Sequence, residues 1–343
     1  MKRLVLTGLL CSVIGLLHAE ELSVEAFTLS AGQTKDIAIC LTNQQQWGGF
    51  QFDIFMPEGV CVFEDEDGLY YEVSERLQYK NGRKTVDMEV QCRQLSNGAY
   101  RFIIANSAKA NINGTEGEVL YLRLVASDAI TTGVCHPMLK GVVLSDVNGN
   151  TLSIDDTTYD CTLQVDTKVS ALGYATFSWP RALDFSGQDV EAFIATERSE
   201  GVLHLQPVTK VPAHTGILLK GAAATYHPET TESVTDDVTG NLLHATDGGA
   251  WEVTGTDVFV LSDLDNGKAG FYRVAEGLLI GQYKSYLQSA SAVRSFVFED
   301  ETTGVRSVGA KASAPYYTLE GVRIGEPQRR GLYISGGKKI IVK

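Results

Sequence analysis

The chain has 343 residues, of which 44% are hydrophobic, and its formal net charge is −13. This length predicts about two domains with ordinary hydrophobic cores. Nucleic acid is excluded as a partner class, because neutralising its phosphates requires a basic surface that this composition lacks. The 34 glycines and 8 prolines are typical of a chain with many short strands and tight turns.

The N-terminal segment has the pattern of a secretory signal peptide. Residues 1–3 are basic at Lys2 and Arg3, residues 4–17 form an apolar run, and a small residue, Ala19, marks a cleavage site. We therefore predict a signal peptide over residues 1–19, which is too short for a membrane anchor. Since no later stretch reaches about 18 uninterrupted apolar residues, we expect no membrane span after cleavage. A lipoprotein signal is disfavoured, because the only cysteine of the segment lies inside the apolar run.

Between residues 20 and 166, apolar side chains recur at every second position. The runs are Ile37, Ile39 and Leu41; Phe50, Phe52 and Ile54; Val86, Met88, Val90 and Cys92; Tyr100, Phe102 and Ile104; Leu120, Leu122 and Leu124; Val142, Val143 and Leu144; and Cys161, Leu163 and Val165. Period-two spacing buries one face of a strand and leaves the other in water. The expected fold is all-β, with two antiparallel sheets packed face to face as a sandwich.

Several phrases in this segment also carry a family resemblance. Residues 41–43, 49–54 and 56–60 are similar to the early strands of cohesin-like and related carbohydrate-binding sandwich domains, and residues 106–124 and 142–149 are similar to the later part of the same fold. The resemblance spans nearly the whole segment. It implies a module that binds proteins or sugars without performing chemistry.

A second β-rich module is predicted over residues 167–300. Its phrases at 169–177, 182–187 and 211–221 resemble an uncharacterised module of large Bacteroidetes surface proteins, for which no chemistry is known. Within it, Asn266 and Gly267 separate two apolar runs and predict a β-hairpin, because a type I′ turn needs the positive φ that these residues tolerate.

The C-terminal segment resembles a sorting signal. Residues 301–314, rich in Thr, Gly, Ser and Ala, have the composition of a flexible linker. Residues 315–343 then contain two short apolar strands, joined by Gly-containing turns and ending in basic residues. This tail is similar to the C-terminal signal of proteins exported by the type IX route. The resemblance implies contact with the secretion machinery and a destination at the outer membrane surface or outside the cell.

Removal of the signal peptide leaves five of the six cysteines, all in the first half of the chain: Cys40, Cys61, Cys92, Cys135 and Cys161. Two disulfides among five cysteines allow fifteen arrangements (five choices of the odd residue times three pairings), and the sequence does not choose between them. A reduced set, packed as small hydrophobic residues, is the alternative.

The search for catalytic motifs finds none of the common ones that bind metal, activate serine or hold phosphate. Cys135 and His136 are adjacent, but neighbouring residues of a strand point to opposite faces and cannot share a proton. The acidic run 64–67 is typical of a solvated loop, with a calcium loop as the alternative. We predict a protein without enzymatic activity.

Two further groups of residues are candidates for ligand binding. Asp146, Asn148 and Asn150 have the alternate spacing of a calcium loop, although a hairpin turn explains them better. Trp47, Tyr70 and Tyr71 are the best candidates for an aromatic platform on which a sugar could stack. We expect no obligatory cofactor, with calcium left open.

The sequence as a whole predicts an exported, non-enzymatic surface protein that mediates adhesion or binds a ligand, either a glycan or another surface protein. Two alternatives stay open. One is a carbohydrate-active enzyme or a remnant of one, which would require two facing carboxylates in a cleft. The other is a structural spacer, which would have neither a cleft nor an aromatic plane.

Overall fold

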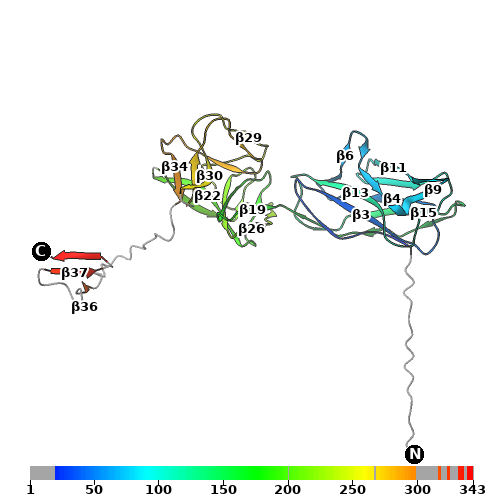
Figure 1. The fold of residues 1–343 in the computed structure, drawn as a ribbon, viewed down its shortest axis with the longest axis horizontal. Helices are drawn as coiled ribbons and strands as arrows, with labels where there is room; N and C mark the ends of the chain where they lie inside the picture. Colours follow the sequence, from blue (N-terminus) through cyan, green and yellow to red (C-terminus); the bar gives the residue numbers. More distant parts are fainter. Residues whose placement is uncertain are drawn as a thin grey trace, which may run out of the picture. The chain divides into compact units, whose positions relative to one another are not determined.

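The computed structural model describes residues 20–199, 201–265 and 268–298, together with the backbone of four short strands nearer the C-terminus (Figure 1). The chain up to Phe298 forms one compact unit, and residues from Glu299 onward form another. In the described residues the only helical element is a single 3-10 turn, η1 (Glu75–Leu77). The prediction of an all-β protein is confirmed.

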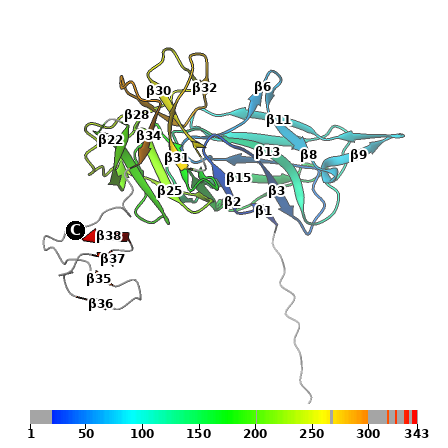
Figure 2. The same cartoon turned by 60° about the vertical axis from the view of Figure 1, so that its left-hand side comes forward.

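Two sheets make up most of residues 20–166. The first contains β1 (Glu21–Val24), β3 (Thr34–Thr42), β13 (Glu118–Ala126) and β5 (Val60–Val62) in this order, with β8 (Tyr71–Val73) also paired to β13. The second contains β11 (Glu89–Gln94), β12 (Tyr100–Ala105), β4 (Gly49–Ile54), β15 (Met138–Ser145) and β16 (Thr151–Ser153), with β17 (Thr157–Thr158) also paired to β15. Figure 2 gives a second view of these strands.

A third, smaller sheet is joined to the first sheet by the short connection that follows β1. It contains β14 (Gly133–Cys135), β18 (Cys161–Gln164) and β2 (Phe27–Ser30). The chain pairs with β3 as β1 and, two residues later, with β18 as β2. Every pair in the two large sheets is antiparallel, as predicted, whereas the β2–β18 pair of this third sheet, which the sequence did not predict, is parallel. After β1 the chain leaves β3 and runs as β2 beside β18, in the same direction as β18.

One hydrophobic cluster fills the space between these sheets. Ile39 and Leu122 from the first sheet, Phe52 and Phe102 from the second and Leu163 from the third all belong to it, and each is at most 2% exposed. The rings of Phe52 and Phe102 stack with their centroids 5.2 Å apart. These are positions that the period-two pattern assigned to the buried face, and the β-sandwich is therefore confirmed.

One predicted strand is broken in the structure. The run from Val86 to Cys92 divides at Met88, because the Met88 N–H donates to the carbonyl oxygen of Leu77. The part before Met88 is β10 (Lys84–Asp87), which pairs with β9 (Gln78–Asn81), whereas the part after it is β11, which pairs with β12. Met88 itself is 2% exposed. The Met88 side chain still points into the core, so the alternation of inward and outward side chains continues across the break between the two strands.

The remaining residues of the first unit are also built from strands. The largest sheet contains β20 (Tyr174–Phe177), β25 (Ile217–Gly221), β22 (Val190–Ser199), β23 (Val202–Val208), β34 (Ser295–Phe298), β31 (Lys268–Arg273), β30 (Val258–Asp265), β33 (Ser285–Gln288) and β28 (Leu243–Ala245). Three small sheets contain β19 (Thr167–Val169) with β26 (Ala224–Tyr226); β24 (Lys210–Val211), β21 (Leu183–Asp184) and β27 (Glu229–Thr230); and β29 (Trp251–Glu252) with β32 (Leu279–Ile280).

This second group of strands has three hydrophobic clusters besides that of the sandwich, and Ala31 packs against both the sandwich cluster and one of these three. The predicted hairpin is confirmed, because Asp265 and Lys268 face each other on β30 and β31 and leave a two-residue connection. The residues of that connection, Asn266 and Gly267, lie outside the described ones. The predicted boundaries of the two modules, at residues 166 and 300, stay a prediction.

In the C-terminal unit, four strands form a sheet in the order β36 (Arg323–Ile324), β35 (Tyr316–Tyr317), β37 (Gly331–Ser335) and β38 (Lys338–Val342). The antiparallel pair β37–β38 corresponds to the two apolar strands expected in the tail. The predicted signal peptide (1–19) and linker (301–314) lie outside the described residues. Within the described part of the chain, no helix has the length and apolar character needed to cross a bilayer.

Candidate functional site

The predicted aromatic platform is not a single exposed plane. Trp47 is 5% exposed and belongs to the core cluster, and its indole Nε1–H donates to Glu20 Oε1 at 3.2 Å. Tyr70 and Tyr71 are half-buried. The Arg123 guanidinium carbon lies 4.2 Å from the centroid of the Tyr70 ring. Trp47 therefore has no open ring face, and the Arg123 guanidinium covers the Tyr70 ring. A binding role for Tyr70 and Tyr71 stays a prediction.

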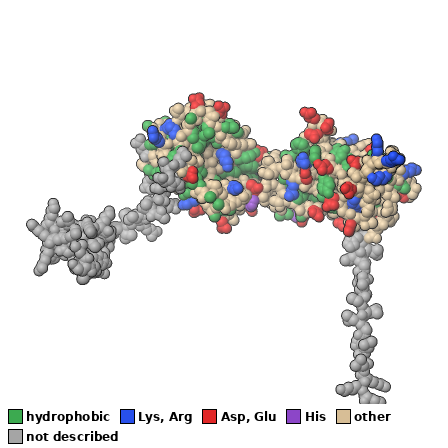
Figure 3. Space-filling view, viewed as in Figure 1, with side chains coloured by type: hydrophobic (Ala, Val, Ile, Leu, Met, Phe, Trp, Pro, Cys, Tyr) green, Lys and Arg blue, Asp and Glu red, His purple; other side chains and the backbone are tan. Residues whose placement is uncertain are grey.

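The acidic run lies where a solvated loop was expected. Its residues belong to a hairpin of β6 (Glu64–Asp65) and β7 (Gly68–Leu69), and all four acidic side chains are exposed. The hairpin projects from the sandwich in Figures 1 and 2, and Figure 3 shows acidic side chains at that place. Among the described residues, no group of three or more His, Cys, Asp or Glu is placed to hold a metal ion.

The second calcium candidate is a turn held by its own side chain. Asp146 Oδ1 accepts the backbone N–H groups of Asn148 and Asn150 at 2.8 and 2.9 Å, and Asp146 Oδ2 accepts the Asn150 amide at 2.7 Å. These bonds, the Asn150 side-chain bond first, hold the pKa of Asp146 below its usual range. Because Ser145 and Thr151 face each other on β15 and β16, the interpretation as a hairpin turn is confirmed.

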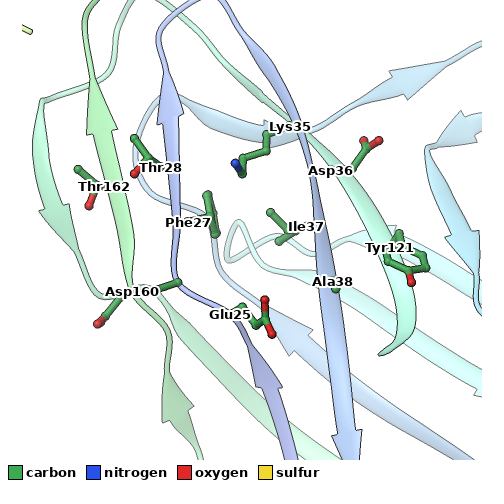
Figure 4. A pocket seen from close by; sticks show the side chains of 11 residues that line it. Glu25, Phe27, Thr28, Lys35, Asp36, Ile37, Ala38, Tyr121, Asp160 and Thr162 are labelled. Carbon is green, nitrogen blue, oxygen red and sulfur yellow. The ribbon is translucent and has the colours of Figure 1, made fainter. Parts of the chain in front are cut away.

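A groove of about 640 Å³ lies beside β2 and β3 (Figure 4). It exists because β3 pairs with β1 only from Ile39 onward, so the first half of β3 has β13 as its one neighbour. Phe27 and Lys35 project into the space between the two strands (Figure 4). Two of its acidic residues have partners in the protein, since Asp36 forms a two-pronged bond with Arg123 and Asp160 lies 2.8 Å from His136 Nδ1.

A second groove, of about 600 Å³, lies on the outer face of the second sheet. Its floor is a row of side chains in register across three strands: Ile103 on β12 faces Gln51 on β4, which faces Val143 on β15. Ile103 is aliphatic and 37% exposed, on a strand that has a neighbour on each side. One exposed aliphatic residue is normal on a protein surface, but Ile103 and Val143 line the same groove and give its floor an apolar character.

Two loops form the walls of this second groove. One is the turn that contains Asp146, and the other contains Lys109, an exposed residue with φ +54°. A side chain other than glycine adopts this left-handed conformation rarely. Asn106 fixes the Lys109 loop, because its Oδ1 accepts the Ala110 N–H at 2.8 Å and its Nδ2 donates to the Gly48 carbonyl at 3.1 Å.

Gly49 sets the depth of the groove at its end. A Cβ atom at this position would lie 2.4 Å from the carbonyl oxygen of Ile104 on the neighbouring strand. Only glycine therefore allows β4 and β12 to approach so closely here. The cohesin-like phrases at 49–54, 106–124 and 142–149, far apart in sequence, all supply residues to this one groove.

Ion pairs flank the floor of the groove. The Arg101 guanidinium forms two bonds with Asp53 across β12 and β4, at 2.6 and 2.7 Å. Bonding to the Asp53 carboxylate raises the pKa of Arg101, so this cation is permanently charged. The row Arg93, Arg101, Asp53 and Lys140 thus lies beside the row that contains Ile103, each in register on adjacent strands. The sheet presents an apolar centre with a charged border.

Several carboxyl groups of the described residues have a pKa outside the ordinary range. Those whose pKa departs from the ordinary value are Asp36, Asp146, Asp184, Asp236 and Asp237, and in each of them the pKa is lowered. A glycoside hydrolase needs a carboxylic acid whose pKa is raised, so that it can protonate the leaving group. Cys135 and His136 also point apart, as expected: Cys135 faces Cys161, whereas His136 contacts Asp160.

Sequence reasoning did not identify the second groove. Its central residue, Ile103, carried a usable signal, because it is an isoleucine in the polar phase of a strand whose buried phase is Tyr100, Phe102 and Ile104. The sequence gives no comparable signal that Lys109 forms part of the groove wall. Its position depends on a loop conformation that propensity does not specify.

No family model and no curated protein sequence matches the chain. Among solved structures, a non-cellulosomal cohesin from the archaeon Archaeoglobus fulgidus is 14% identical, covers 43% of this chain and 91% of its own, and has a TM-score of 0.32. A cohesin module from a Clostridium perfringens family 33 glycoside hydrolase is 10% identical, with coverages of 43% and 97% and a TM-score of 0.32.

The sixth cohesin of Acetivibrio cellulolyticus scaffoldin B, solved in complex with a dockerin, is 10% identical, with coverages of 43% and 100% and a TM-score of 0.35. These three chains are cohesin modules, the class of sandwich that the sequence analysis predicted for residues 20–166. Identities at this level concern the fold alone.

Proposed function

We propose that this chain is an exported, non-enzymatic surface protein whose β-sandwich binds another protein through the groove on the outer face of the second sheet. The observation that carries the proposal is the groove whose floor contains the exposed Ile103, in register with Gln51 and Val143. Protein interfaces are typically built from an apolar centre within a polar border. The ligand is then a protein segment that places an apolar side chain over Ile103.

A protein ligand is favoured over a glycan by the state of the aromatic residues. Sugars stack on exposed aromatic rings. Trp47 is buried and the Tyr70 ring carries the Arg123 guanidinium, so two of the three candidate rings have contacts within the protein, and Tyr71 alone would be a small platform. The groove floor instead offers two aliphatic side chains and one amide.

The wall residue Lys109 adds a preference for the charge of the ligand. Its side chain is exposed, and the opposite wall residue, Asp146, already accepts three hydrogen bonds within its own turn. Asp146 stays ionised, because these bonds lower its pKa, so the positive charge that the groove offers lies at the Lys109 wall alone. An acidic side chain next to the apolar one in the ligand would be attracted, mainly through a faster association rate that falls with salt.

The test uses the protein without its predicted signal peptide, labelled and added to intact cells of the producing organism. Bound label is measured before and after protease treatment, before and after periodate treatment, and with a chelator. We expect protease to remove binding, and periodate and the chelator to leave it. Loss with periodate alone would contradict a protein ligand, and binding that needs calcium would restore the calcium hypothesis. No binding under any condition would favour the spacer.

Variants tie the binding to the groove. Ile103→Arg should weaken binding at least 10-fold, the range expected when a central interface residue is lost, and Lys109→Ala should reduce its salt dependence. Val134→Arg is the matched control, since Val134 is 64% exposed on β14, a strand of another sheet, and should bind normally. If Ile103→Arg bound as well as the control, the groove would not be the site.

Export rests on the two ends of the chain, which carry the predicted signal peptide (1–19) and sorting tail (315–343). Deletion of residues 315–343 should leave a folded protein inside the cell, detected by fractionation and immunoblotting. Finding the shortened protein at the surface in normal amounts would contradict the role of the tail and leave the binding proposal intact.

A further inference from the structure

Two of the five cysteines are direct neighbours across a pair of strands. Cys135, the last residue of β14, is the register partner of Cys161, the first residue of β18, in an antiparallel pair. Facing residues of adjacent strands direct their side chains to the same face of the sheet. Both belong to the core side here, since Cys161 is fully buried and Cys135 packs against the same hydrophobic cluster.

The spacing of such a pair matches the geometry of a disulfide. Facing residues in antiparallel strands have Cα atoms about 4.5 or 5.5 Å apart, according to the type of pair. Disulfides join residues whose Cα atoms are about 4.4–6.8 Å apart. A bond between the two sulfur atoms therefore needs side-chain rotation and no movement of either strand.

The other three cysteines face residues that cannot form a disulfide. Cys40 on β3 lies between Ser23 and Glu118, Cys61 on β5 faces Val125, and Cys92 on β11 faces Phe102. Each of the fifteen arrangements counted from the sequence contains two disulfides, whereas the register supports a single bond and gives the other three cysteines no facing cysteine.

We propose that Cys135 and Cys161 are a cross-linking site, which becomes a disulfide when the protein is exported to an oxidising compartment. The oxidant is a small disulfide or a disulfide-exchange protein. The Cys135 sulfur attacks it, forms a mixed disulfide and releases one thiol. The Cys161 sulfur then attacks the mixed disulfide at Cys135 and releases the second thiol. Two electrons and two protons pass from the cysteine pair to the oxidant.

Burial determines when this reaction takes place. Cys135 is partly accessible whereas Cys161 is not, so Cys135 is the thiol that meets the oxidant. Desolvation, with the neighbouring Cys135 adding to it, raises the pKa of Cys161 to about 12, and burial also raises the pKa of Cys135. Since the thiolate is the attacking species, the folded protein should oxidise slowly and the bond should form mainly during folding.

The experiment is peptide mapping of the protein without its signal peptide. The protein is unfolded in reductant, refolded in a mixture of reduced and oxidised glutathione, alkylated, and digested with trypsin without reduction. Trypsin cleaves after Arg123, Lys140 and Lys168, so the two cysteines fall in separate peptides, 124–140 and 141–168. We expect these two peptides to be linked by a disulfide. Recovery of both as separate alkylated peptides, or a link to any other cysteine, would overturn the proposal.

A second measurement is thermal stability, with a variant at the partly accessible Cys135, so that the buried Cys161 is left unchanged. Closing a loop of this length should raise the melting temperature by about 5–10 °C, and reduction should remove the increase. Cys135→Ser, at the half-buried position, should melt at the same temperature with and without reductant. Cys61→Ser, at an exposed position, should keep both the linked peptides and the response to reductant. A wild-type protein with no response would count against the bond.

Discussion

Arg76 is expected to be the most important single charged residue for the stability of the sandwich. It lies in η1, and its guanidinium donates to the carbonyl oxygens of Asn113, Gly117 and Leu41 at 2.7, 2.7 and 2.5 Å, and to the side chain of Asn43 at 2.7 Å. One side chain thus joins the end of β3, the start of β13 and the loop before it. We predict a large loss of stability when Arg76 is replaced by Ala.

The size of the loss follows from these contacts. A hydrogen bond that involves a charged group contributes about 1.5–3 kcal/mol, and contributions within one network are not additive. Asn43, one of the acceptors, is 2% exposed, so its side chain would lose a partner that water replaces poorly. We expect Arg76→Ala to lower the free energy of unfolding by about 3–4 kcal/mol, and Arg76→Lys to lower it by about 2 kcal/mol, because an ammonium group cannot reach all four acceptors.

Urea unfolding followed by tryptophan fluorescence and circular dichroism measures this loss. Arg123→Ala is the matched control: Arg123 also makes two bonds, to Asp36, but both partners are at the surface, with exposed fractions of 33% and 52%. Surface ion pairs contribute about 0–1 kcal/mol. Equal losses for the two alanine variants would refute the reasoning that burial of the acceptors makes the Arg76 contacts strong.

Two more predictions concern other parts of the first unit. Arg181 Nη1 donates to the carbonyl oxygens of Ala129 and Ile130 at 2.8 and 2.9 Å. Arg181→Ala should therefore weaken the attachment of the second module to the sandwich and split one calorimetric unfolding transition into two. A single transition at an unchanged temperature would contradict this. In reductant, the raised pKa of Cys161 stabilises the fold fully below pH 9 and progressively less as pH rises toward 12. Cys161→Ala should flatten this slope, measured by urea unfolding at each pH, whereas Cys61→Ala should leave it unchanged.

The core of the sandwich could be predicted from the sequence because strand alternation is a local property. Phe50, Phe52 and Ile54 alternate with polar residues, Tyr100, Phe102 and Ile104 recur at every second position, and all six are buried. The pattern failed only where a backbone contact, invisible in the sequence, ended a strand, as Met88 does by donating to Leu77. The alternation of apolar residues predicts which side chains point into the core, but it does not predict where a strand ends.

The candidate site could not be predicted in the same way, because it depends on register. Ile103, Gln51 and Val143 are far apart in the chain and become neighbours only when three strands align. The aromatic residues were interpreted wrongly in one respect for a related reason. Trp47 looked available next to two glycines, but its indole lies in the core and bonds to Glu20, whose distance in sequence hides the contact.

The position of β2 has a consequence for the time at which this protein can fold. Its neighbour in the small sheet is β18, and the Ser30 and Gln164 side chains that bond across them are 134 residues apart in the chain. A ribosome or a translocation pore delivers the earlier strand long before the later one. Until residue 164 emerges, one layer lacks its partner strand and the hydrophobic interior stays open to water. The sandwich therefore cannot close until about half of the 343 residues have been delivered.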